Sequence, residues 1–174
     1  DHGEELLEHG STGHGITLYE EVIRVPLLIR VPGLGEGLRV PERVGLVDLL
    51  PTLLELMGQP VPQGLQGRSL VARIAGAAQA DRRILSMIDY PDRSLRRAII
   101  ENDTKLILSQ TTPRMVVRPA NEVELFRLGE DPVEQVNSAS SGQDIVTLLR
   151  RRMNAAATES AAIQNLFQGD SDPG

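Results

Sequence analysis

Arg97-Ala98-Ile99-Ile100-Glu101-Asn102-Asp103-Thr104-Lys105-Leu106-Ile107-Leu108 contains two short, mainly apolar runs separated by a polar pair. Runs of this length with isoleucine and leucine are typical of strands. Asparagine and aspartate tolerate the backbone conformations that a tight turn requires. The stretch therefore predicts two antiparallel strands, over residues 97–101 and 105–108, joined through Asn102-Asp103.

The flanking sequence extends this unit. Residues 84–88 and 123–128 are strand-like, and residues 144–166 have apolar side chains at helical intervals with an alanine-rich end that favours helix. We therefore expect a small antiparallel sheet followed by a C-terminal helix.

The N-terminal third has a different pattern. Residues 25–31 form a mostly apolar run closed by Pro32-Gly33, which predicts a strand buried on both faces of a largely parallel sheet. Asp48 can cap a leucine-rich helix that keeps Pro51 in its first turn and ends at Gly58. The Pro-, Gln- and Gly-rich segment 59–67 predicts an irregular loop and a domain boundary.

Composition limits the classes of protein. Hydrophobic residues make up 40% of the 174 residues and charged residues 24%, which is ordinary for a folded domain. A net charge of -6 and an aromatic content of 2% argue against a nucleic-acid partner, which favours basic surfaces and stacking platforms. The apolar run in residues 25–29 is far shorter than a membrane span.

All three histidines, His2, His9 and His14, lie in the first 14 residues, among acidic residues and glycines. Histidine and carboxylate side chains bind divalent metals or move protons near neutral pH. Asp1 and His2 are adjacent, so they can reach one ion only if the backbone turns sharply, which we expect Gly3 to permit. The alternative is a solvated segment without a site.

Short motifs occur along the chain, beginning with the segment just described. They are Asp1-His2-Gly3-Glu4, Glu8-His9-Gly10, Gly13-His14-Gly15, Leu18-Tyr19-Glu20-Glu21, Arg24 to Ile29, Asp48 to Leu56, Gly67-Arg68-Ser69-Leu70, Lys105 to Leu108, Glu124 to Leu128 and Asp131 to Asn137. In this order they resemble the metal-site segment, the following helix and the C-terminal subdomain of the sulfatases in the alkaline phosphatase superfamily.

The resemblance implies an α/β fold: the C-terminal portion of an alkaline-phosphatase-like mixed-sheet sandwich, plus a small antiparallel sheet subdomain with a C-terminal helix. In these terms residues 1–66 would be the C-terminal part of the main α/β domain, residues 67–168 the C-terminal subdomain, and residues 169–174 a disordered tail.

The resemblance also implies part of a metal-dependent sulfatase that hydrolyses sulfate esters of small molecules or glycans. The family's nucleophile, a formylglycine or, in phosphatase relatives, a threonine or serine, lies upstream of the Asp-His pair. The sequence has no cysteine and starts at that pair. We therefore expect a missing N-terminal half that supplies the nucleophile, and an inactive chain without it.

By the same resemblance, Asp1 and His2 are metal ligands, with calcium as the first expectation and manganese or zinc as alternatives. His14 would contact the transferred group or the leaving oxygen as a catalytic and substrate-binding residue. Arg24 is a candidate contact for the substrate anion, and the structural alternative pairs it with Glu20 or Glu21.

Other residues of the motifs have structural expectations. His9 is expected to support the loop, Glu4 to orient His2, Tyr19 to pack beneath the loop, and Asp131 and Glu134 to form a turn. The segment 88–93 is a candidate for substrate selection.

Three alternatives remain open. The first is a phosphodiester or phosphonate monoester hydrolase of the same superfamily, which differs mainly at the nucleophile. The second is a non-catalytic fragment or split subunit that binds a partner through exposed apolar surface. The third is a self-contained metal-binding domain that uses Asp1, His2, His9 and His14.

Overall fold

A computed structural model describes residues 1–33, 37–77, 80, 82–90, 94–111 and 122–168. Contacts within the chain group it into two compact units, one formed by Asp1–Leu27 and Arg83–Arg150 and the other by Leu28–Arg82 and Arg151–Gly174. The predicted boundary between the main α/β domain and the C-terminal subdomain, after residue 66, stays a prediction. The predicted tail and Pro91–Arg93 lie outside the described residues.

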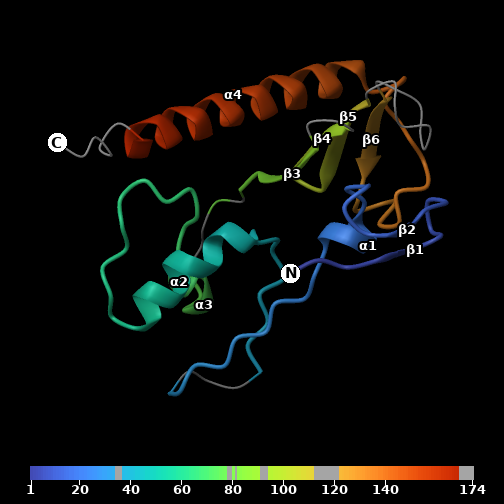
Figure 1. Cartoon of the computed structure of the whole chain (residues 1–174). Helices are drawn as coiled ribbons and strands as arrows, with labels where there is room; N and C mark the ends of the chain where they lie inside the picture. The colour runs from blue at the N-terminus through green and yellow to red at the C-terminus, as the bar shows by residue number, and fades with distance from the viewer. Residues whose placement is uncertain (34–36, 78–79, 81, 91–93, 112–121, 169–174) are drawn as a thin grey trace. The chain divides into compact units, whose positions relative to one another are not determined.

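The first unit is built on the predicted antiparallel sheet (Figure 1). Its strands β3 (Ile84–Tyr90), β4 (Ser94–Glu101), β5 (Thr104–Thr111) and β6 (Glu122–Arg127) pair in sequence order. Glu101 pairs with Thr104 around a two-residue turn in which Asn102 and Asp103 have φ values of 47° and 57°. The sheet, its order along the chain and this turn confirm the prediction.

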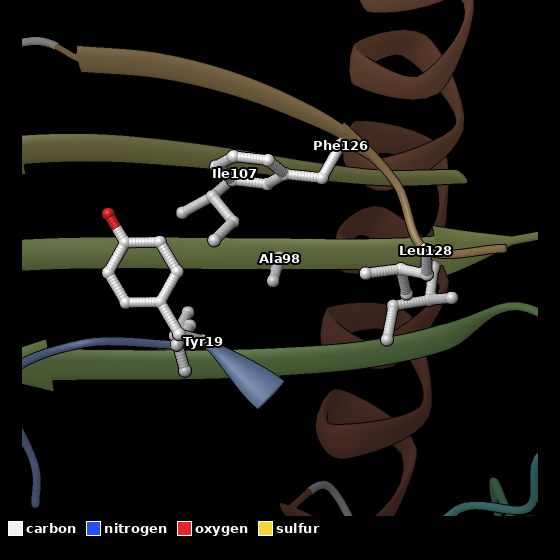
Figure 2. Packing of buried hydrophobic residues seen from close by; sticks show 7 residues of the cluster. Tyr19, Ala98, Ile107, Phe126 and Leu128 are labelled. Atoms are coloured by element: carbon white, nitrogen blue, oxygen red, sulfur yellow. The ribbon is translucent and has the colours of Figure 1, made fainter. Parts of the chain in front are cut away.

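One face of the sheet holds a core to which the N-terminal segment contributes (Figure 2). Because side chains alternate along a strand, the paired residues Ala98, Ile107 and Glu124 share this face, while Ile99 and Leu106 point to the other. Leu18 and Tyr19 cover the first face, and the ring of Tyr19 meets Phe126 edge-on at a centroid distance of 6.1 Å. The N-terminal segment is thereby fixed on the sheet.

That N-terminal segment contains three short elements that the sequence did not reveal. The strands β1 (Glu5–Leu6) and β2 (Thr12–Gly13) form a hairpin, and α1 (Glu20–Ile23) follows it. Each element is two to four residues long, too short for a periodic pattern to be recognised.

The second unit contains the predicted leucine-rich helix. A single 3-10 turn, η1 (Leu46–Asp48), leads into α2 (Leu49–Leu56), and α3 (Val71–Ile74) follows the loop. Asp48 is fully buried, but its carboxylate does not cap α2. It accepts hydrogen bonds from the backbone N–H groups of Gly45 at 3.0 Å and Arg68 at 2.9 Å and pairs with Arg82, so it ties the loop to the helix start.

The predicted buried strand over residues 25–31 is wrong for this structure. These residues have no regular secondary structure, and Leu27, Leu28 and Ile29 are exposed. A strand needs a neighbour that accepts and donates its backbone hydrogen bonds. Among the described residues none pairs with this run, so its apolar composition alone does not produce a strand.

The long helix α4 (Gln143–Gln168) confirms the predicted C-terminal helix (Figure 1). Val146 and Leu149 on its first turns are buried, and Gly142 just before it lies against Leu125 of β6, where a Cβ would come within 2.5 Å of the leucine side chain. The described part of the chain has no helix with the length and apolar content that crossing a membrane requires. The fold is α/β, as predicted.

Candidate active site

Gly3 places the N-terminal motif against α1. Its N–H donates to the carbonyl of Val22 at 2.8 Å, and a Cβ built on Gly3 would lie 2.0 Å from the backbone oxygen of Glu21. Gly3 is not among the residues with positive φ. Glycine is therefore required here because two backbones approach closely, and not for the sharp turn that we expected.

Four side chains around Gly3 form an exposed group, here called the site cluster: Asp1, His2, Glu4 and His14. The Nε2 atom of His2 lies 3.8 Å from Oδ1 of Asp1, and Nδ1 of His14 lies 2.7 Å from Oε1 of Glu4. The rings of His2 and His14 are 4.1 Å apart. The structure thus brings together the predicted metal ligands and the predicted catalytic histidine.

The geometry of His2 and Asp1 fits a divalent cation. Nδ1 of His2 lies 2.9 Å from the carbonyl of Gly3, and because a carbonyl only accepts, Nδ1 carries a proton, so in the neutral ring the lone pair is on Nε2. Two ligands bound to one ion at about 2.0–2.6 Å stand roughly 3–4 Å apart. The 3.8 Å between Nε2 and the Asp1 carboxylate is within that span.

Two other predicted residues have different surroundings. The carboxylate of Glu4 is hydrogen-bonded to His14, whereas we expected it to orient His2. Glu4 therefore fixes the ring of His14, the predicted catalytic residue. The donor atoms of His2, Glu4 and His14 lie within 4.8 Å of one another, which makes this triplet a second ligand set for an ion. Arg24 is exposed, and the carboxylates of Glu20 and Glu21 contact Lys105 and His9.

His9 belongs to a second, mostly buried group, here called the buried cluster: His9, Glu21, Tyr19 and Glu134. Nδ1 of His9 is 2.5 Å from the Glu21 carboxylate, and Nε2 is 3.0 Å from the backbone carbonyl of Glu134. Its ring stacks on Tyr19 at 3.7 Å with planes 13° apart. Burial lowers the pKa of His9, but bonds and charges from Glu21 and Glu134 outweigh this and raise it above its ordinary value.

Glu5, His9 and Glu21 also lie close enough to hold an ion. However, the carboxylate of Glu5 accepts hydrogen bonds from Ser11 N–H at 3.0 Å and the Thr17 hydroxyl at 2.8 Å. Both nitrogens of His9 already face acceptors. We therefore assign this triplet a structural role, and the self-contained metal domain that includes His9 is not supported.

Lys105 joins the N-terminal segment to the C-terminal turn beneath the buried cluster. Its Nζ is fully buried, 3.1 Å from Glu20 and 2.8 Å from Glu134. Burial raises the pKa of Glu134, and the charge of Lys105 opposes that rise. The sequence placed Lys105 in a predicted strand and in one of the family motifs, and indicated no ion pair for it. The available signal was that it is the sole lysine of the sequence and stands directly before the apolar run Leu106 to Leu108.

The turn that contains Glu134 is fixed on β6. The Asp131 carboxylate accepts N–H bonds from Gln135 at 3.1 Å and Val136 at 2.8 Å. Asn137 accepts from Leu125 N–H and donates to the Val123 carbonyl, each at 3.1 Å. These bonds explain the Asp131 to Asn137 motif and hold Glu134 in a left-handed conformation with φ of 55°.

Comparison with known proteins identifies a family and relatives that match most of the chain or a large part of it. The family model described as "N-sulphoglucosamine sulphohydrolase, C-terminal" matches residues 8–159. Human arylsulfatase K is 28% identical over 160 residues, which cover 89% of this chain and 29% of that protein. Mouse arylsulfatase K is 40% identical over 78 residues, covering 45% of this chain. The chain spans less than a third of the length of these relatives.

Solved structures show the same fold. A putative sulfatase from Bacteroides thetaiotaomicron superposes with a TM-score of 0.70 at 22% identity, covering 99% of this chain and 38% of that chain. A phosphonate monoester hydrolase from Silicibacter pomeroyi gives 0.71 at 24% identity, covering 91% of this chain and 33% of that chain. Fold likeness therefore spans sulfatases and phosphonate monoester hydrolases alike.

Proposed function

Because the chain belongs to the N-sulphoglucosamine sulphohydrolase C-terminal family of sulfatases, we propose that it forms the C-terminal part of a metal-dependent enzyme that hydrolyses sulfate esters of small molecules or glycans. One observation carries the proposal: Asp1, His2 and His14 lie together on an exposed surface, with Nε2 of His2 3.8 Å from the carboxylate of Asp1.

In this proposal Asp1 and His2 hold a divalent cation, calcium first, with manganese or zinc as alternatives. When bound, the ion would neutralise charge on the oxygens of the transferred group. The site lies at the surface, where side-chain exposures of 90% for Asp1 and 42% for His2 leave room for further ligands and substrate. The proposed N-terminal half would supply those ligands and the nucleophile.

His14 is proposed as the catalytic side chain of this region. Glu4 holds one ring nitrogen at 2.7 Å, so the other nitrogen can address a sulfate oxygen or give a proton to the departing alcohol. Its ring lies 4.1 Å from that of His2, which keeps it near a group bound to the cation. Arg24, exposed beyond α1, is proposed as a further contact for the substrate anion.

The competing function is hydrolysis of phosphonate monoesters, because structural neighbours include such enzymes. The curated relatives with sequence similarity over most of the chain are arylsulfatases, which favours the sulfate ester. The third candidate is a non-catalytic subunit that binds a partner, for which exposed apolar side chains such as Leu28 and Met57 would be contacts.

Metal binding tests the ligands directly. Mn²⁺ titration followed by electron paramagnetic resonance should show a site that Asp1→Asn and His2→Gln each weaken by about tenfold or more. Asp144→Asn, an exposed carboxylate in the first turn of α4, is the matched control and should bind as the parent does. Equal Mn²⁺ affinity in all four proteins would refute the assignment.

Activity tests the reaction. The protein assembled with its proposed N-terminal half should release nitrophenol from 4-nitrophenyl sulfate faster than from 4-nitrophenyl phenylphosphonate, and His14→Gln should reduce kcat by about a hundredfold or more. Preference for the phosphonate would establish the competing function. A protein whose denatured mass is near 19.0 kDa, with no companion chain, and which turns over neither ester would support the non-catalytic function.

A further inference from the structure

We infer that His9 is a positioning residue: as an imidazolium it pins the tip of the β1–β2 hairpin to α1 and to the turn at Glu134, and thereby sets the position of His14. The inference rests on the proposed function for the role of His14. It goes beyond that function by naming a residue outside the site cluster that controls its geometry.

The contacts of His9 require two N–H donors. The backbone carbonyl of Glu134 only accepts, so Nε2 carries a proton. The carboxylate of Glu21, 2.5 Å from Nδ1, is a charge-assisted acceptor for a second proton. A neutral imidazole has one N–H and satisfies only one of these contacts, whereas the imidazolium satisfies both.

The surroundings favour that cation. Glu21 on α1 and Glu134 in the turn raise the pKa of His9 above its ordinary value against the opposing effect of burial. Glu5 of β1 presents a third carboxylate within 4.8 Å of the ring nitrogen and Glu21. Lys105 is the cation on the far side, where it pairs with the Glu134 side chain, and the electron-rich face of Tyr19 stacks on the ring.

The hairpin transmits the position of His9 to the site cluster. Its tip is tight, because Leu7 N–H donates to the Ser11 carbonyl at 2.9 Å and Leu7 has φ of 80°. Glu5 pairs with Gly13 at the opposite end, so Glu4 and His14 follow directly from that pair. A two-stranded hairpin of this size is only marginally stable by itself, so the contacts of His9 at its tip decide where the hairpin lies.

The sign of the pH dependence follows from the raised pKa. The anchor is complete below the ordinary histidine value of about 6.5 and is lost as pH rises through the higher value of the folded state. At alkaline pH the ring keeps only one of its two protons, so one of the two contacts, to Glu21 or to the Glu134 carbonyl, becomes a contact between two acceptors.

The experiment is 15N NMR of the histidine side chains and amide exchange of the intact protein, without metal. At pH 6 both nitrogens of His9 should have imidazolium shifts, and the titration midpoint should lie above the ordinary value of 6.5. In His9→Gln, the amide of Leu7 should exchange about tenfold faster or more and the ring signals of His14 should shift, while Ile99 and Leu106 in the sheet keep their protection.

Glu21→Gln provides the second test if His9→Gln does not fold. It keeps an acceptor for Nδ1 but removes the charge, so the midpoint of His9 should move to lower pH. Glu130→Gln, an exposed glutamate near the same turn, is the charge-matched control and should leave the midpoint unchanged.

Two outcomes would overturn the inference: a His9 titration midpoint at or below 6.5, or hairpin amides and His14 signals that do not change in His9→Gln. Failure of the proposed function is distinguishable, because it would appear as absent Mn²⁺ binding or absent turnover while the metal-free NMR result stands. If both stand, Mn²⁺ affinity should fall several-fold above the His9 midpoint in the parent and show no such step in His9→Gln.

Discussion

The first 21 residues supply histidines and acidic side chains to both the site cluster and the buried cluster, and the two groups have opposite environments. In the site cluster, His14 and Glu4 have side-chain exposures of 52% and 50%. In the buried cluster, His9 and Glu21 have exposures of 9% and 16%. Both contain a histidine hydrogen-bonded to a glutamate, yet both nitrogens of His9 lie within 3.0 Å of an acceptor, whereas Nε2 of His2 lies 3.8 Å from the Asp1 carboxylate, beyond hydrogen-bond distance.

The difference shows that residue type does not decide the role of a histidine. A histidine with both nitrogens satisfied and one face stacked on an aromatic ring is structural, since nothing remains to bind a ligand. A histidine whose backbone bond fixes the tautomer while the other nitrogen faces a carboxylate in solvent can bind a cation. Substitutions should therefore separate the groups, with stability lost in one and ligand affinity in the other.

The largest expected effect is at Lys105. Lys105→Met should lower the free energy of unfolding by about 3–5 kcal/mol, because it leaves the buried carboxylates of Glu20 and Glu134 without their cation. Urea denaturation followed by circular dichroism measures the loss. Arg127→Met, an exposed cation at the end of β6, is the control and should change stability by less than about 0.5 kcal/mol.

Gly3 lies between the two groups. Gly3→Ala should cost about 1–3 kcal/mol, since its Cβ would sit 2.0 Å from the Glu21 backbone oxygen and one backbone must move. Gly129→Ala is the matched control, because its Cβ would meet only ordinary contacts at 3.9 Å. Thermal unfolding of both variants tests the prediction, and equal melting temperatures would contradict it.

Tyr19 supports the ring of His9 from below. Tyr19→Phe keeps the stacking but removes the 2.6 Å hydrogen bond to the buried Glu124 carboxylate, so we expect a loss of about 1–2 kcal/mol. Tyr19→Leu should cost more, because it also removes the stacking and the edge contact with Phe126. A Tyr19→Phe variant as stable as the parent would show that the bond contributes nothing.

The smallest stability effect is expected at the site cluster. Asp1→Asn and His2→Gln should each change the free energy of unfolding by less than about 0.5 kcal/mol, since both side chains are exposed. The same two variants should lose Mn²⁺ affinity by about tenfold or more. If either variant were strongly destabilised, the substituted residue would have a structural role like that of the buried cluster, which would contradict the distinction between the two groups.

Sequence patterns predicted the elements with their own local signals. The β4–β5 pair is set by two apolar runs around Asn102-Asp103, and α2 and α4 by helical spacing. The run over residues 25–31 has an apolar content similar to that of the β4–β5 strands but does not form a strand. Strand formation also requires a neighbouring segment that supplies backbone hydrogen bonds. Hairpin β1–β2 was missed because two-residue strands leave no pattern.

The sequence by itself determined the family, through ordered motifs, and the segment that contains the candidate site, through the clustering of histidines and acids. Only the tertiary structure distinguished the structural role of His9 from the proposed ligand and catalytic roles of His2 and His14, because residues distant in sequence decide which histidine is buried. Glu134, 125 residues from His9, supplies the acceptor that occupies Nε2. The burial of Lys105 likewise depends on the tertiary structure, which places the carboxylates of Glu20 and Glu134 beside its ammonium group. A charge is buried at acceptable free-energy cost only where opposite charges compensate the loss of hydration.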